Sequence, residues 1–189
     1  MNEHDLRRTV EILAAALSSL GIRFHVTGGL ASSYYGEPRM TRDVDVVVRL
    51  GPSEGRRLVE ALAGEFLIGE AAVREAITNR GFFQALHSVT LVKADFHVGE
   101  RVDGELDRSV LREVFEGVTV PMVSKEDAIL SKLIWIREGS ARSRNDVVGM
   151  LLDETEFDIG SVRSRAKSLA CESILAELER EAESLRGGS

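Results

Sequence analysis

The sequence is poor in the residues that build disulfides, cysteine-based metal sites and membrane segments. Cys171 is its only cysteine among 189 residues, which excludes an internal disulfide and a cysteine-based zinc cluster. No apolar run approaches the roughly 20 residues that cross a bilayer. The amino terminus also lacks a basic stretch followed by an apolar one, as a secretion signal would have. We therefore expect a cytoplasmic protein with no membrane contact.

Positive charge and aromatic residues are also scarce. The net charge of −7 argues against a protein that coats nucleic acid through a broad basic face, and aromatic residues at 5% do not suggest a base-stacking platform. No Walker-type lysine motif or Gly-x-Gly-x-x-Gly pattern is present. Short basic clusters remain at Arg39 and Arg42 and at Arg137, Arg142 and Arg144. We expect local contacts with an anion and no extended nucleic-acid surface.

The hydrophobic pattern predicts a sheet followed by helices. Apolar spacing near 3.6 predicts helices over residues 3–20, 30–36, 53–63, 71–79, 124–137, 144–153, 159–170 and 172–185. Ser53 and Ser124 are the predicted N-caps of the third and fifth of these helices. Alternation predicts strands over 22–26, 43–48, 82–89, 90–98 and 118–122. The fold class is therefore α+β, with a mixed-sheet domain over 1–123 and a helical region over 124–189 packed on it.

Two aspartates lie on one face of the second predicted strand. Asp43 and Asp45 alternate with three valines, so both carboxylates point to the same side. Such a pair repels unless a cation lies between its members, and hard oxygen ligands suit Mg²⁺ or Mn²⁺. The alternative is a solvated strand edge on a structural protein, because Asp-x-Asp also occurs there.

A glycine pair precedes the aspartates by fourteen residues. Gly28 and Gly29 lie between a predicted strand and a predicted helix, where backbone N–H groups can face an anion. A phosphate cradle and a metal pair are the two elements that phosphoryl chemistry requires. Arg39 and Arg42, just before the metal pair, would meet either phosphate or base, or else serve as charge partners of the aspartates.

These residues resemble the DNA polymerase β-like nucleotidyltransferase superfamily. Its signature is Gly-Gly or Gly-Ser followed by Asp-x-Asp, here Gly28-Gly29 and Asp43-Val44-Asp45. The family's third carboxylate lies on a later strand, often in a Lys-x-Asp context, and Lys93-Ala94-Asp95 matches. The resemblance covers residues 20–100 and implies that Asp43, Asp45 and Asp95 are catalytic metal ligands.

Within the superfamily, the run from Arg39 to Asp45 is most similar to stand-alone bacterial proteins of the abortive-infection, AbiEii-type toxin kind. Those proteins also carry an acidic residue, a helical lysine and an Arg-x-Asp-like element, which Asp127, Lys132 and Arg144-Asn145-Asp146 fit. The resemblance implies nucleotide binding, ATP included, by residues Gly28, Gly29, Arg39, Arg42, Lys132 and Arg144. A solvated helix lysine remains the alternative for Lys132.

The resulting hypothesis is a magnesium- or manganese-dependent nucleotidyltransferase. It would move a nucleoside monophosphate from a nucleoside triphosphate to a hydroxyl on a small molecule, a protein or an RNA end, and release pyrophosphate. The rival hypothesis is a non-catalytic nucleotide- or partner-binding member of a toxin–antitoxin pair. Both hypotheses allow a partner protein.

Overall fold

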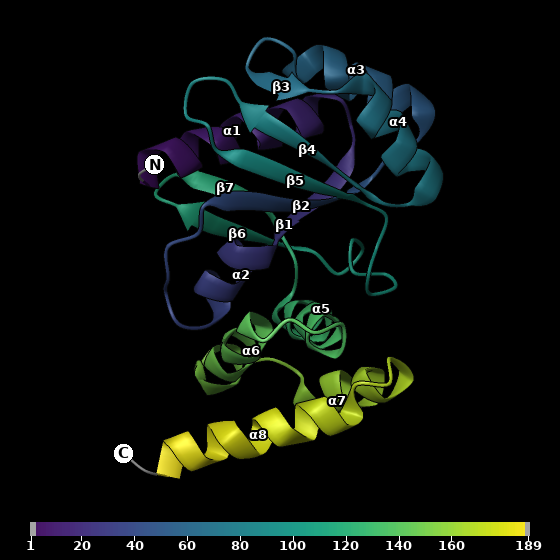
Figure 1. The fold of residues 1–189 in the computed structure, drawn as a ribbon. Coiled ribbons are helices and arrows are strands. Elements are labelled where there is room, and N and C mark those ends of the chain that lie inside the picture. The colour runs from purple at the N-terminus through teal and green to yellow at the C-terminus, as the bar shows by residue number, and fades with distance from the viewer. Residues whose placement is uncertain (1–2, 188–189) are drawn as a thin grey trace. The chain divides into compact units, whose positions relative to one another are not determined.

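The computed structural model describes residues 3–187, which form two compact units (Figure 1). The first unit contains the chain up to Leu30 and residues 41–123. The second contains residues 31–40 and the chain from Ser124 onward. Helix α2 (Gly28–Tyr35) begins in the first unit and ends in the second.

The first unit is built on one mixed sheet. Within residues 3–187, seven strands pair in the order β3-β4-β5-β2-β1-β7-β6, with β2–β5 and β1–β7 parallel and the other pairs antiparallel. The strands are β1 (Arg23–Thr27), β2 (Asp43–Arg49), β3 (Phe66–Ile68), β4 (Phe82–His87), β5 (Lys93–Val98), β6 (Val110–Phe115) and β7 (Val118–Met122). The helices of this unit are α1 (Glu3–Ser19), α3 (Pro52–Leu62) and α4 (Glu70–Asn79).

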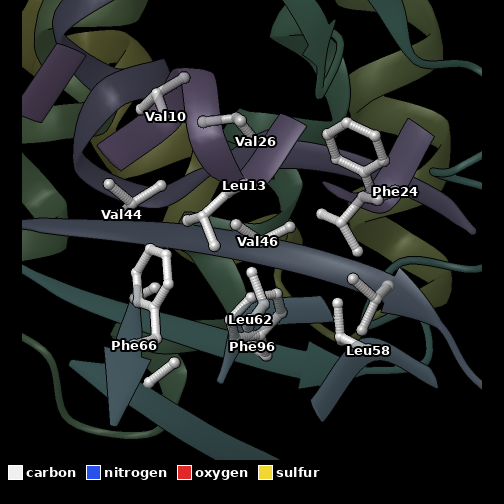
Figure 2. Packing of buried hydrophobic residues seen from close by; sticks show 14 of the residues in the cluster. Val10, Leu13, Phe24, Val26, Val44, Val46, Leu58, Leu62, Phe66 and Phe96 are labelled. Carbon is white, nitrogen blue, oxygen red and sulfur yellow. The ribbon is translucent and has the colours of Figure 1, made fainter. Parts of the chain in front are cut away.

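One face of the sheet forms the hydrophobic core. Alternation in β2 places Val44, Val46 and Val48 on this face, and all three are almost fully buried. Side chains of α1 and α3, among them Leu13 and Leu58, pack against them (Figure 2). Each such buried side chain contributes roughly 1.5–3 kcal/mol relative to an exposed one. The burial of one face fixes the strand register and turns every second residue, including the aspartates of β2, to the opposite face.

The second unit is helical. It contains α5 (Lys125–Arg137), α6 (Arg142–Leu152), α7 (Ile159–Ser168) and α8 (Glu172–Gly187). Residues 31–40 pack on α6, because a Cβ on Gly36 would lie only 2.9 Å from the backbone nitrogen of Met150. No helix among residues 3–187 is long and apolar enough to cross a membrane.

The α+β class and the mixed sheet are as the sequence predicts. The Ser124 cap is confirmed, since its side chain accepts a hydrogen bond from Asp127 N. The Ser53 cap is wrong: Gly51 is the N-cap of α3, and Ser53 Oγ donates to Glu54 instead. Proline at the first helical position explains this start, because its missing N–H costs nothing there.

Candidate active site

The strand register places Asp45 and Asp95, two of the three predicted metal ligands, side by side on the polar face of the sheet. The register sets Thr27 of β1 beside Asp45 of β2, and Asp45 beside Asp95 of β5. Gln84 of β4 lies beside Asp95 on its other side. Neighbouring strands are about 4.8 Å apart, so Asp45 and Asp95 are direct neighbours. In the adjacent row, Asp43 lies beside Lys93.

The glycine pair lies against the second aspartate. Gly28 has a φ of +62°, and a Cβ at this position would lie 1.9 Å from Asp45 Oδ2. Both the left-handed backbone and the lack of space require glycine here. Gly29 N lies 3.4 Å from Asp45 Oδ2 and donates a hydrogen bond to it. The first turn of α2 therefore presents backbone N–H groups next to the carboxylate row.

Each carboxylate also has side-chain partners. Thr41 Oγ1 donates to Asp43 Oδ1 at 3.1 Å, and His97 Nε2 lies 3.7 Å from Asp45 Oδ1. The hydrogen bond from Lys93 to Asp95 raises the pKa of Lys93 against the opposing effect of burial. The charges of Asp95, Asp43 and Asp45 raise this pKa further, so one lysine lies in the field of all three carboxylates.

The donor set fits a hard divalent cation. Carboxylate oxygens on neighbouring strands are the ligands that Mg²⁺ prefers in proteins, and the excess negative charge of the row favours a cation. Among residues 3–187, however, no three carboxylates, imidazoles or thiols are placed to share one ion. Side-chain rearrangement must therefore accompany the binding of a metal by Asp43, Asp45 and Asp95 together.

Three of the predicted nucleotide contacts belong to the second unit. Arg39 Nε and Nη2 bind the carboxylate of Asp146 at 3.0 and 3.1 Å, and Lys132 Nζ binds it at 2.7 Å. Burial opposes ionisation of Asp146, yet the hydrogen bonds and charges of Lys132 and Arg39 hold its pKa below the usual range. Arg144 instead pairs with Glu177 and Glu181. Arg39 is therefore the charge partner of Asp146, not of the aspartates of β2.

Gln84 is the neighbour that sequence reasoning overlooked. Its Nε2 donates to Asp95 Oδ1 at 2.9 Å. The signal was a polar residue at an alternate position of β4, between Phe82 and Leu86, on the same face as Asp95.

A family model matches most of the chain. Residues 11–147 match the model of the family described as nucleotidyl transferase AbiEii toxin, type IV TA system. The chain belongs to the AbiEii family. It is therefore a nucleotidyltransferase, and its family is one of toxins from type IV toxin–antitoxin systems. No curated protein matches the sequence.

Solved structures share the fold at low sequence identity. An antigenic nucleotidyltransferase-like protein from Paracoccidioides brasiliensis aligns with a TM-score of 0.57 and 16% identity, over 95% of this chain and 94% of that one. The antibiotic-resistance factor ANT(2'')-Ia aligns with a TM-score of 0.52 and 17% identity, over 99% and 96%. JHP933 from Helicobacter pylori aligns with a TM-score of 0.52 and 11% identity, over 100% and 97%. These solved structures show the fold of this chain.

Proposed function

We propose that the protein transfers a nucleoside monophosphate from a nucleoside triphosphate to a hydroxyl acceptor, with Mg²⁺ or Mn²⁺ and with release of pyrophosphate. The observation that carries this proposal is the row on the polar face, in which Asp45 lies between the Gly28-Gly29 turn and Asp95. A carboxylate row beside the backbone N–H groups of a helix start would combine a cation site with a phosphate site.

The roles follow from position in this row. Asp43 and Asp45 would hold two metal ions, and Asp95 would join one of them. The bound cations would lower the pKa of the attacking hydroxyl and offset charge on the leaving pyrophosphate. Asp95, at the end of the row farther from Gly28, would accept the proton of the acceptor hydroxyl. Gly28 and Gly29 would direct N–H groups to the β- and γ-phosphates.

The proposal assigns phosphate contacts to cations as well. Arg39 and Lys132 share the single carboxylate of Asp146 and so retain a net positive charge. Their side chains are 28% and 15% exposed, which makes them preorganised yet accessible donors. Arg42 and Arg144 are further candidates. Arg144 would have to break its ion pairs with Glu177 and Glu181 before it could bind a phosphate. ATP is the first triphosphate to test.

The proposal also includes a hydroxyl acceptor and a partner protein. A small molecule, a protein hydroxyl or an RNA end would each fit a local acceptor site. The family description adds an antitoxin as the partner protein. One observation favours the rival hypothesis of nucleotide or partner binding without turnover: both oxygens of Asp95 already accept hydrogen bonds or ion pairs within the protein.

A labelling experiment tests the proposal. Purified protein is incubated with each α-³²P-labelled nucleoside triphosphate, Mg²⁺ and a cell extract, and the labelled product is identified. We expect transfer of label from one or more triphosphates, and loss of transfer when the metal is chelated. Binding of the triphosphate without transfer in any extract fraction would favour the rival. Transfer that persists in excess chelator would contradict metal dependence.

A further inference from the structure

Lys93 occupies a special position in the acidic row. It lies beside Asp43 in the parallel pairing of β2 with β5, and two residues before Asp95 on the same strand face. Its side chain is 41% exposed, yet its Nζ turns inward to lie 3.1 Å from Asp95 Oδ2. The only lysine of the polar face therefore points to the carboxylates rather than to solvent, within the part of the chain that the structure describes.

Asp95 is held at both of its oxygens. Gln84 donates to Oδ1 from β4, and Lys93 pairs with Oδ2 from β5 itself. Gln84 is neutral and lies on the side away from Asp45, whereas Lys93 is a cation on the strand next to Asp43. The two contacts therefore differ in kind: one orients the carboxylate, and the other supplies positive charge where a metal ion would supply it.

We propose that Lys93 is a positioning residue that acts as a tethered cation, holding Asp95 apart from the metal site until the incoming ion replaces its ammonium group. This inference rests on the proposed function, because it concerns the same three carboxylates. It explains why no three potential ligands are placed to share an ion in residues 3–187 although Asp45 and Asp95 are neighbours in register.

Two physical properties favour replacement of the lysine by an ion. A partly exposed lysine–carboxylate pair is weak, since water screens it and the flexible side chain loses entropy when it is held. A divalent ion carries twice the charge and binds several carboxylates at once. Lys93 would then keep the acidic row stable without metal, at the cost of competing with the ion that catalysis requires.

The inference predicts opposite effects of one substitution on two properties. Without metal, Lys93→Met should unfold at a lower temperature than the wild type, because three carboxylates lose their nearby cation. In a titration with Mn²⁺ alone, followed through the electron paramagnetic resonance of the free ion, the same variant should bind about three- to tenfold more tightly. Lys93→Arg, which keeps the charge, should restore the affinity of the wild type.

The controls separate this inference from simpler explanations. Lys167→Met removes an exposed lysine of α7 and should leave Mn²⁺ affinity unchanged. Gln84→Leu should change affinity less than Lys93→Met does, because it removes no charge. If Lys93→Met fails to fold, Lys93→Gln replaces it in the same titration.

Three outcomes decide the matter. Tighter Mn²⁺ binding by the neutral variant and recovery with arginine support the inference. A second outcome is that the wild type binds Mn²⁺, Asp45→Asn does not, and the neutral variant binds it no more tightly than the wild type. This outcome overturns the role of Lys93 and leaves the proposed function intact. Absence of binding in both the wild type and the neutral variant removes the metal site of the proposed function, and the inference with it.

Discussion

Two charge clusters, one on the polar sheet face of the first unit and one in the helical second unit, are unbalanced in opposite directions. The first gathers Asp43, Asp45 and Asp95 around one lysine, whereas the second gathers Arg39 and Lys132 around the single carboxylate of Asp146. Taken separately, the carboxylate cluster suits a divalent cation and the Arg39–Lys132 cluster suits an anionic group such as a phosphate.

The largest expected effect comes from removing one charge on the acidic side. Asp45→Asn keeps the shape of the side chain but loses a metal ligand, so nucleotide transfer should fall by about a thousandfold. The fold should persist, and stability should stay equal or rise slightly, because like charges repel less. Labelled-triphosphate transfer and urea unfolding measure the two effects.

Asp103→Asn serves as the control for this prediction, since Asp103 is an exposed residue of the segment between β5 and β6. It should alter neither property. Near wild-type transfer by Asp45→Asn in Mg²⁺ would contradict the role assigned to the carboxylate.

The corresponding substitution in the second unit should act on stability first. Asp146 is buried and neutralises two cations, so Asp146→Asn would leave Arg39 and Lys132 facing each other without a counter-charge. We expect a loss of about 2–4 kcal/mol in the free energy of unfolding. Urea denaturation of both asparagine variants tests the comparison directly. A variant of Asp146 as stable as that of Asp45 would show that the two sites do not differ in this way.

The phosphate-binding role of the cationic side can be tested separately. Lys132→Met should weaken triphosphate binding by about 1.5–3 kcal/mol, or roughly tenfold to a hundredfold. Lys125 is unsuitable as a control, because its buried Nζ binds Asp153 and the carbonyl of Thr155. Lys167→Met is the matched control. Equal and small losses in a nucleotide titration would return Lys132 to a purely structural role beside Asp146.

Acidification should weaken the second unit through Asp146. The pKa of this carboxyl is lowered in the folded state, relative to about 3.9 when unfolded. Its ionised form therefore contributes stability that is present above the unfolded pKa and lost as the pH falls through the folded pKa. The stability gap between the wild type and Asp146→Asn should be constant near neutrality and shrink below about pH 4. Urea denaturation from pH 7 to pH 3 measures this difference in the free energy of unfolding. A difference that widened on acidification would contradict the prediction.

The sequence predicts the acidic cluster of the first unit better than the cationic cluster of the second. Strict alternation around Asp43 and Asp45 reveals a two-faced strand, and a glycine pair before a helix reveals the turn beside it. The pairing of Asp45 with Asp95 depends on β5 lying parallel to β2, which no local pattern encodes. The contact of Arg39 with Asp146 spans 107 positions of sequence and depends on tertiary packing.

Two strands also escaped prediction, for local reasons. β3 has only three residues, which is too short for a period to be read. β6 lies at the edge of the sheet, where none of its six residues is fully buried and polar side chains such as Arg112 and Glu113 are tolerated. Edge strands need no continuous apolar face, so their sequences resemble loops.

The smallest expected effect concerns salt and an RNA acceptor. Four arginines of the two basic clusters, Arg39, Arg42, Arg142 and Arg144, would give a log–log slope of affinity against salt of roughly −2 to −4 if all were available. The structure reduces this number, because Arg39 is paired with Asp146 and Arg144 with Glu177. Within residues 3–187, Arg42 and Arg142 are exposed and have no carboxylate partner.

Two neutralised phosphates of a single strand predict a slope of about −1.4. Binding of short RNA ends between 50 and 200 mM salt measures it, with Arg42→Gln expected to reduce the slope by about 0.7. A slope near −3 would mean that phosphate also displaces the carboxylates from Arg39 and Arg144, and one as steep as about −8 would require a basic surface that the net charge of −7 argues against.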